Sequence, residues 1–405
     1  METLSELYRI GLGPSSSHTI GPYRIIKHYL KKYPNTKSFD VYLYGSLALT
    51  GKGHQTDVSL IEAAGKDKPV KVFYDIKKKV DHPNTMDVIG YDQNQKPLGT
   101  MTGVSTGGGA IEIKGEPYDN SINVFPHHNF NEIKAWCKEN KKNLVDYVQH
   151  FDPNGFKHLD EVWEVMKQSI LDGLSHSGMF DGVIKLSRKA KLALNNIKKA
   201  KLPTDSIYYA MAYGYAVAEI NVMHGKLVTA PTLGAAGILP AVLYYCEYNL
   251  KFSSKKIIEA LAVAGVIGNC FKHNGTIAGA TGGCQAEQGS ACSMAAAAYC
   301  YLMNGDLDLI EASAIIAIEH HLGLTCDPIL GHVYSPCIER NAQLAMRAII
   351  SYGQALLTNG KHELFDLDDV ILVQKHTGEQ MHSDYKETGL GGLSWMWKKK
   401  NNYPV

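Results

Sequence analysis

A series of strongly helical segments in the second half of the chain constrains the fold more than any other feature. The clearest covers residues 290–303 and contains Met294 followed by four alanines and a tyrosine. Because a helix that is apolar on every side has no face for solvent, it belongs in the middle of a bundle. Helical spacing or strong helix formers also mark residues 159–174, 180–198, 207–223, 255–269, 307–322 and 339–357. We therefore expect residues 155–405 to form a mostly α-helical domain.

Segments rich in glycine and proline interrupt these helices at residues 228–237, 274–289 and 325–336. Cys284, Cys326 and Cys337 lie in or beside two of these breaks, where a side chain at a bend can turn toward a shared point. Three thiolates suit a soft metal centre, either iron–sulfur or zinc. The alternative is that they are buried small hydrophobes, because separations of 41 and 10 intervening residues fit no short zinc-finger pattern. Spacing alone leaves both readings open.

Composition and charge exclude several classes of protein. The formal net charge is +1, and basic residues cluster only in short lysine runs, so the sequence predicts no nucleic-acid partner. Residues 1–7 lack the basic stretch and apolar core of a signal peptide. The most apolar stretches, such as residues 257–268, are too short and too rich in Ala and Gly to span a membrane. We therefore expect a cytoplasmic protein with no membrane partner. Its eight cysteines then favour metal binding over disulfides.

Residues 1–150 have a different pattern, in which short strands alternate with helices and polar loops. Alternation of apolar and polar residues predicts strands at residues 40–44, 70–74 and 98–104. Turn-forming residues at 150–158 then separate this part from the helical region. We place a small mixed α/β domain at residues 1–150 and assign the whole chain to the α+β class.

One polar loop in this region directly precedes a helix. It contains Ser15, Ser16, Ser17 and His18. A helix N-terminus beside serine hydroxyls favours an anion such as a carboxylate, although the serines could equally be plain helix caps. His18 adds a titratable donor at the same place.

Further polar loops follow predicted strands. The segment Thr50-Gly-Lys-Gly-His54-Gln-Thr-Asp57 presents a histidine on a tight turn, and its spacing does not fit a phosphate-binding loop. His82-Pro-Asn84 reads as a turn. The three glycines of Gly107-Gly108-Gly109 expose backbone N–H groups of the kind that anion sites use.

These motifs together resemble those of the iron–sulfur L-serine dehydratases (L-serine ammonia-lyases) of bacteria in their single-chain form. The resemblance covers essentially the whole chain and rests on Gly13-Pro-Ser-Ser-Ser-His18-Thr, Gly51-Lys-Gly-His54, His82-Pro-Asn84, Gly107-Gly-Gly109, Thr229-Ala-Pro-Thr232, Gly283-Cys284-Gln, Thr325-Cys326-Asp-Pro, Pro336-Cys337-Ile-Glu-Arg-Asn341 and Tyr385-Lys386-Glu387-Thr388. It implies that Cys284, Cys326 and Cys337 hold a [4Fe–4S] cluster through three irons. The fourth iron is then left for substrate.

The resemblance implies an enzyme that deaminates L-serine to pyruvate and ammonia by eliminating water. A base must remove the Cα proton, and we expect His54, or else His18, because the pKa of imidazole lies near neutrality. Either histidine could instead only position the substrate, and Lys386 is a further catalytic candidate. The resemblance also implies a homodimer and a small amino-acid substrate held by residues from Ser15, Ser16, Ser17, His82, Asn84, Gly107, Gly108, Gly109, Thr232 and Asn274.

Three motifs depart from the family pattern, at Leu233, Thr281 and Tyr334. All three lie in breaks that we expect to line the site, so a related [4Fe–4S] lyase acting on another small hydroxy or amino acid is the alternative. A cluster-binding sensor without turnover is a second alternative, although it would need no substrate pocket. Pyridoxal-phosphate chemistry is disfavoured, because no lysine stands in a recognisable Schiff-base context.

Overall fold

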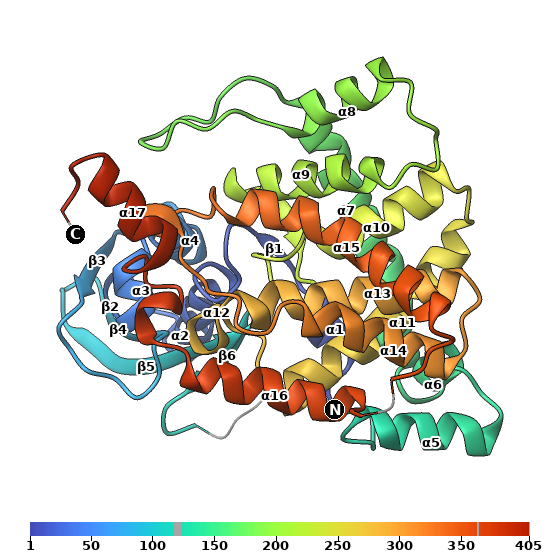
Figure 1. The fold of residues 1–405 in the computed structure, drawn as a ribbon. Helices are drawn as coiled ribbons and strands as arrows, with labels where there is room; N and C mark the ends of the chain where they lie inside the picture. The colour runs from blue at the N-terminus through green and yellow to red at the C-terminus, as the bar shows by residue number, and fades with distance from the viewer. Residues whose placement is uncertain (117–122, 363, 405) are drawn as a thin grey trace.

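Five strands from the first third of the chain form one sheet, at the left of Figure 1. The computed structural model describes residues 1–116, 123–362 and 364–404. The strands lie in the spatial order β3 (Val70–Asp75), β2 (Ser38–Tyr44), β4 (Thr85–Tyr91), β5 (Pro97–Gly107) and β6 (Ala110–Ile113). The β2–β3 pair is parallel and the other pairs are antiparallel. The three strands predicted from alternation are confirmed, whereas β4 and β6 were not predicted.

The sheet buries one face under helices α2 (Ile20–Lys32) and α4 (Thr56–Ala64). Alternate residues of β2, namely Phe39, Val41 and Leu43, are buried in the core of this sheet region. Parallel strands need a long crossover connection. Between β2 and β3 this connection consists of α3 (Gly45–Thr50), a turn that carries His54, and α4. The crossover therefore positions His54 near the carboxyl end of β2.

Most of the remaining described chain is helical and forms a larger body, at the right of Figure 1. At its centre lies α13 (Ser290–Leu302), whose residues are all buried except Tyr301. It packs against α10 (Ile238–Tyr244), α11 (Ser254–Asn274), α14 (Leu307–Glu319) and α15 (Cys337–Leu357). Its alanines let these neighbours approach closely on every side. The predicted central helix and the α+β class are confirmed.

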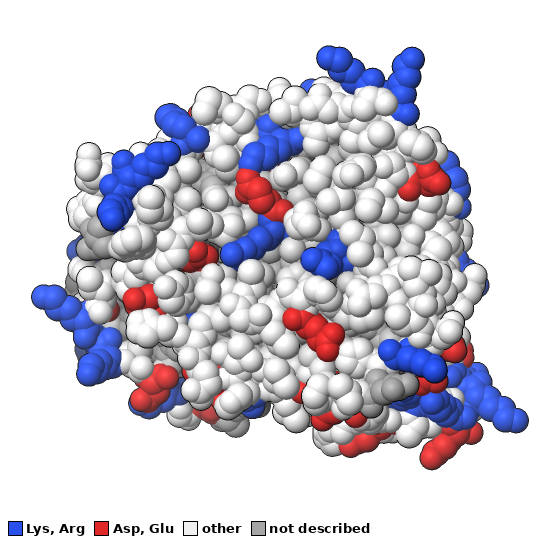
Figure 2. Space-filling view, viewed as in Figure 1, with Lys and Arg blue, Asp and Glu red and all other residues white. Residues whose placement is uncertain are grey.

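Further helices cover this centre. They are α7 (Pro153–Ser175), α9 (Tyr208–Val222) and α16 (Leu367–Gln380), with α5 (Phe130–Asn140) and α6 (Leu144–Phe151) beside them. Helix α17 (Gly392–Lys400) lies instead at the left of Figure 1, against residues 329–331. No helix in the described ranges is both long and apolar enough to cross a membrane. On the face seen in Figure 2, cationic and anionic side chains are interspersed, as a net charge near zero leads one to expect.

One predicted helix, over residues 180–198, is wrong in its first half. Residues 178–188 form an irregular loop closed by an isolated bridge between Met179 and Ser187, and α8 (Ala190–Lys199) begins only after it. The loop turns at Gly182, whose φ of 117° a helix cannot accommodate. The buried Glu219 carboxylate accepts hydrogen bonds from the Lys189 and Ala190 amides, which fixes the start of α8.

The N-terminus belongs to the helical body rather than to the sheet region. Helix α1 (Leu4–Leu7) buries Leu4 and Leu7 in the body's core, and the Tyr8 hydroxyl donates a hydrogen bond to the Leu261 carbonyl. Strand β1 (Ile10–Leu12) then pairs with β7 (Lys226–Val228). The first residues of the chain therefore pack against the helical body, and the sheet region begins after them. The domain boundary near residue 150 stays a prediction.

Candidate active site

Three buried cysteines lie where breaks between helices meet. Cys284 directly precedes a π-helical turn (Gln285–Gly289) that leads into α13, and Cys337 is the first residue of α15. Cys326 lies in the irregular segment between α14 and α15. All three are free thiols. The Cys284 and Cys326 sulfurs lie within 4.8 Å of one another. Burial, together with the charge of the nearby Cys284, raises the pKa of Cys337. The π-turn is a deviation that helices often make at functional sites.

Backbone pairing holds these breaks together. The Cys326 amide donates to the Tyr385 carbonyl, and the Cys326 carbonyl accepts from the Glu387 amide. Gly283 has a φ of 72°, and a β-carbon there would lie 2.9 Å from the Leu324 carbonyl oxygen. Only glycine therefore allows the segment before Cys284 to pack this closely against the segment before Cys326.

A guanidinium group lies beside the three thiols. Arg340 follows Cys337 by three residues on α15, so both side chains lie on one face of the helix. Its Nη1 donates to the Thr325 carbonyl at 2.7 Å, and its Nη2 lies 3.7 Å from Asp327 Oδ1. The Cys326 thiol lowers the pKa of Cys284 to about 7, and the charge of Arg340 acts in the same direction. The Cys284 thiol and burial raise the pKa of Cys326, and burial raises that of Cys337, so Arg340 favours the thiolate, which is the form that binds metals, most clearly at Cys284.

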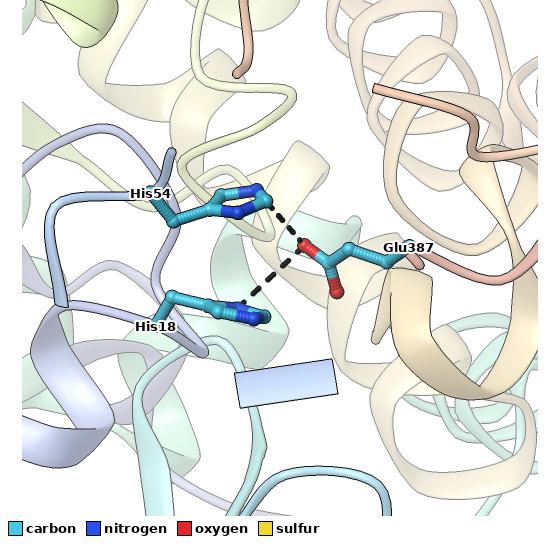
Figure 3. A group of neighbouring side chains, drawn as sticks. All are labelled: His18, His54 and Glu387. Atoms are coloured by element: carbon cyan, nitrogen blue, oxygen red, sulfur yellow. Dashed lines mark ion pairs between the residues drawn. The ribbon is translucent and has the colours of Figure 1, made fainter. Parts of the chain in front are cut away.

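Two histidines from the sheet region stack beside one another (Figure 3). The rings of His18 and His54 lie with centroids 4.3 Å apart. His54 Nδ1 lies 3.1 Å from the Thr50 carbonyl oxygen, which can only accept a hydrogen bond. The proton of neutral His54 is therefore on Nδ1, which leaves Nε2 free to take up a proton.

Glu387 points between the two rings (Figure 3). Its Oε1 lies 3.5 Å from His54 Nε2 and 3.8 Å from His18 Nδ1, and it accepts a hydrogen bond from Ser15 Oγ at 3.3 Å. Glu387 has a φ of 57°, a left-handed conformation that is uncommon outside glycine. Its amide bonds to Cys326, and its carbonyl accepts from Ser46 Oγ at 2.8 Å. Backbone strain held in place by such contacts is typical of functional sites.

Burial sets the charge state of this group. It lowers the pKa of His18 to about 4, and burial together with the neighbouring His18 holds the pKa of His54 well below its ordinary value. Burial, reinforced by the charge on Cys284, raises the pKa of Glu387 to about 8. Near neutral pH both rings are therefore neutral, and the carboxyl proton of Glu387 can be shared with His54 Nε2. Strongly perturbed groups that converge in this way mark a candidate active site.

A second buried carboxylate, Glu287, lies on the π-turn after Cys284. Its Oε1 accepts a hydrogen bond from Thr232 Oγ1 at 2.7 Å. Burial raises its pKa well above the usual value, and the negative charge of Glu387 adds to this effect. Cys284, Cys326 and Glu287 each offer one donor atom, and the three atoms lie within 4.8 Å of one another.

Comparison with known proteins identifies the family of the chain. A family model described as "Serine dehydratase alpha chain" matches residues 99–394, and one described as "Serine dehydratase beta chain" matches residues 3–75. The chain belongs to the serine dehydratase family. It is 34% identical to the L-serine dehydratase of Haemophilus influenzae, over 97% of this chain and 99% of that protein. It is 33% identical to L-serine dehydratase 1 of Escherichia coli, over 97% and 99% of the two chains. The family membership predicted from the motifs is confirmed.

Several residues that the serine dehydratase motifs singled out lie around these histidines and carboxylates. His18, His54 and Ser15 meet Glu387, Thr232 binds Glu287, and Ser17 Oγ lies 2.9 Å from His18 Nδ1. Ser16 is buried in the same loop.

The other predicted substrate-binding residues lie in nearby loops or have partners elsewhere. Gly107 and Gly108 pack against Ile277 and Ala278, whereas Gly109 packs against Ile20. His82 Nδ1 accepts from the Asn84 amide, and the Asn84 side chain is buried with no hydrogen-bond partner in the described part of the chain. Asn274 is the last residue of α11, and its Nδ2 donates a hydrogen bond to the His128 carbonyl.

Sequence reasoning missed Glu287, Glu387 and Arg340, and it chose Lys386 beside Glu387. The structure turns the Lys386 ammonium to the Glu379 carbonyl, at 3.3 Å. Lys386 forms an isolated bridge with Cys326, and the backbone then turns at the left-handed Glu387, so the two neighbouring side chains have different surroundings. Glu387 directly follows Lys386, and Glu287 and Arg340 each follow a predicted cluster ligand, Cys284 or Cys337, by three residues. The signal that could have found them was a charged side chain close in sequence to a predicted site residue.

Proposed function

We propose that this chain is an L-serine dehydratase that carries a [4Fe–4S] cluster and eliminates water from L-serine, giving pyruvate and ammonia. The observation that carries the proposal is a buried group of Cys284, Cys326 and Glu287 beside a second buried group of His18, His54 and Glu387, which backbone hydrogen bonding between Cys326 and Glu387 joins. The names of the relatives point to the same substrate.

The donor set fits a cluster with three protein ligands. Cys284, Cys326 and Cys337 would each bind one iron, because thiolates are the usual ligands of iron–sulfur clusters. Arg340 supplies a positive charge beside all three sulfurs, which offsets the charge of a thiolate-bound cluster. When bound, such a cluster supplies a Lewis acid that makes the β-hydroxyl a better leaving group.

His54 is the proposed base for the Cα proton. Its neutral ring, with Nδ1–H held by Thr50, presents Nε2 as the only free acceptor of the imidazole. Glu387 faces that nitrogen and can exchange the proton with it. Loss of the Cα proton and of the β-hydroxyl as water leaves an enamine, which becomes an imine and is hydrolysed to the 2-oxo acid and ammonia. General-base catalysis of this kind contributes about 10²–10⁴-fold to a rate.

The substrate carboxylate is assigned to the loops at the edge of the sheet region. Ser15, Ser16 and Ser17 precede α2, whose N-terminus favours an anion. The backbone at Gly107 and Gly108 lies beside the break that contains Ala278. These loops come from the same region as the histidines, so substrate held by them would lie within reach of His54.

The test is turnover under strictly anaerobic conditions. Iron-loaded protein is offered L-serine, L-threonine, L-cysteine and small hydroxy acids, and 2-oxo acid and ammonia are measured. We expect pyruvate from L-serine, and a broad brown absorbance without the aldimine band of pyridoxal phosphate. Iron-loaded protein that converts none of these compounds would instead be a cluster-binding sensor.

A second candidate substrate is suggested by the altered motifs. Thr281 Oγ1 bonds to Thr276 Oγ1 at 2.7 Å, and the Tyr334 hydroxyl bonds to the Asp181 carbonyl at 3.2 Å, so both hydroxyls have partners away from Glu387. Leu233 differs from these two residues because its side chain is apolar. It is buried and directly follows Thr232, which binds Glu287. Faster turnover of a larger hydroxy or amino acid than of L-serine would favour this alternative.

We also propose, from the family resemblance, that the protein works in the cytoplasm as a homodimer. Sedimentation of the iron-loaded protein over a range of concentrations tests the second point. A monomer at all concentrations would contradict it.

A further inference from the structure

One oxygen of each buried carboxylate is turned toward the same small space at Gly279. A β-carbon at that position would lie 2.6 Å from Glu287 Oε2 and 3.4 Å from Glu387 Oε2. Glycine is therefore required there, because any side chain would displace the carboxylates. Glu387 Oε2 has no hydrogen-bond partner among the residues that the structure describes, although Glu387 is only 3% exposed.

Two carboxylates in this setting need a positive partner. Two ionised carboxylates that share one buried space repel each other, so both can be ionised together only with a cation between them. An unpartnered polar atom in a dry site is unfavourable as well. A cation between the two Oε2 atoms would remove both penalties, and it would have to be small enough to fit beside Gly279.

We propose that Glu287 and Glu387 form the subsite for the α-ammonium group of the substrate. This inference rests on the proposed function, and it narrows the substrate to an α-amino acid rather than a hydroxy acid. An ammonium group has three donors and no acceptor, which matches two carboxylates that face each other. Glu287 is held in place by Thr232, and Glu387 by its backbone bonds to Cys326 and Ser46.

In this arrangement the two oxygens of Glu387 have different roles. Oε1 faces His54 Nε2 at 3.5 Å, and Oε2 faces the space at Gly279. The ammonium nitrogen is bonded directly to Cα, so binding it at Oε2 brings the Cα proton near His54. A hydroxy acid would leave both carboxylates unpaired, and sites built on buried polar partners discriminate strongly against ligands that lack the matching group.

The experiment compares two probes that differ only in the ammonium group. L-Alanine and propanoate both lack a β-hydroxyl and cannot be dehydrated, so their binding to iron-loaded protein is measurable by anaerobic calorimetry. We expect the wild type to prefer L-alanine by roughly 10- to 150-fold, the usual worth of hydrogen bonds to a charged group. Glu387→Gln and Glu287→Gln should each lose most of this preference and keep their affinity for propanoate.

Glu219→Gln is the matched control. Glu219 is also buried, and its Oε2 has no hydrogen-bond partner in the described part of the chain, but its Oε1 caps the start of α8. This variant should keep the preference for L-alanine. Equal affinities of the wild type for the two probes, or an unchanged preference in Glu387→Gln, would overturn the subsite. Loss of iron from Glu287→Gln would assign that carboxylate to the metal and overturn its place beside the ammonium group.

The measurement also separates this inference from the proposed function. If L-alanine is preferred but L-serine is not converted, the dehydratase assignment fails and the subsite stands. If L-serine is converted but the preference is absent, only the subsite fails.

Discussion

The helical body and the sheet region contribute different chemistry to one site. The body holds three thiols at helix starts and in a tight break, next to its most densely packed helix, α13. The sheet region supplies His18 and His54 from loops. Metal ligands must be held rigidly, whereas a base must reach over the substrate from another direction. The difference shows that the site is formed where the two regions meet.

The contact between the regions is close. A β-carbon at Gly53 would lie 2.4 Å from the Gly331 carbonyl oxygen, so the loop that carries His54 touches the segment between Cys326 and Cys337. Glu387, from the C-terminal part of the chain, joins both sides by bonding to Cys326 and facing His54. The same comparison predicts that damage to the body removes the cluster, and that damage to the sheet region leaves it in place.

The largest effect is expected from Cys326→Ala. A cluster with three protein ligands that loses one should not be retained, so iron content, visible absorbance and turnover should all disappear. Cys300→Ala is the control, because Cys300 is a buried thiol that packs in the body's core. Iron content in Cys326→Ala equal to that of the wild type would refute the assignment.

Exposure to air should abolish activity almost as completely, but reversibly. An iron without a protein ligand is open to oxidants, whereas fully thiolate-ligated irons are shielded. Activity measured after exposure should return on treatment with iron and reductant. Iron-loaded protein that stays active in air for days would contradict a three-cysteine site.

His54→Ala should act on the rate alone. We expect the cluster's spectrum to remain and kcat to fall by about 10²–10⁴-fold, the usual worth of a general base. Exchange of the Cα hydrogen with solvent should fall in parallel. His320→Ala is a matched control, since His320 Nδ1 likewise bonds to the carbonyl four residues before it. Near-normal turnover by the His54→Ala enzyme would contradict this role and favour His18 as the base.

We expect the smallest effect from two variants that each remove one methylene group, one variant in each region. Ile26 lies in the sheet core and Ile267 in the body core, and both are fully buried. Ile26→Val and Ile267→Val should each lower the free energy of unfolding by about 1 kcal/mol. Calorimetry then shows whether they shift separate transitions, as two domains predict. A single transition shifted equally by both variants would show that the regions unfold as one unit.

The sequence predicted the fold class because its main signals are local. An all-apolar helix can only be central, and alternation marks β2, β3 and β5. The pattern failed at residues 180–189, where Gly182 and the distant Glu219 decide that the helix starts late. Strand β4, which begins directly after the predicted turn at His82-Pro-Asn84, was not predicted.

By itself, the sequence determined which segments are helical, where they break and that soft ligands stand at the breaks. Only the tertiary structure decided which charged residues enter the site. Lys386 and Glu387 are neighbours, yet the bridge to Cys326 and the left-handed turn at Glu387 leave one at the Glu379 carbonyl and the other between two histidines. Glu287 meets Glu387 only because Gly279 leaves room for both. Such choices depend on contacts between residues far apart in the chain, which no local pattern records.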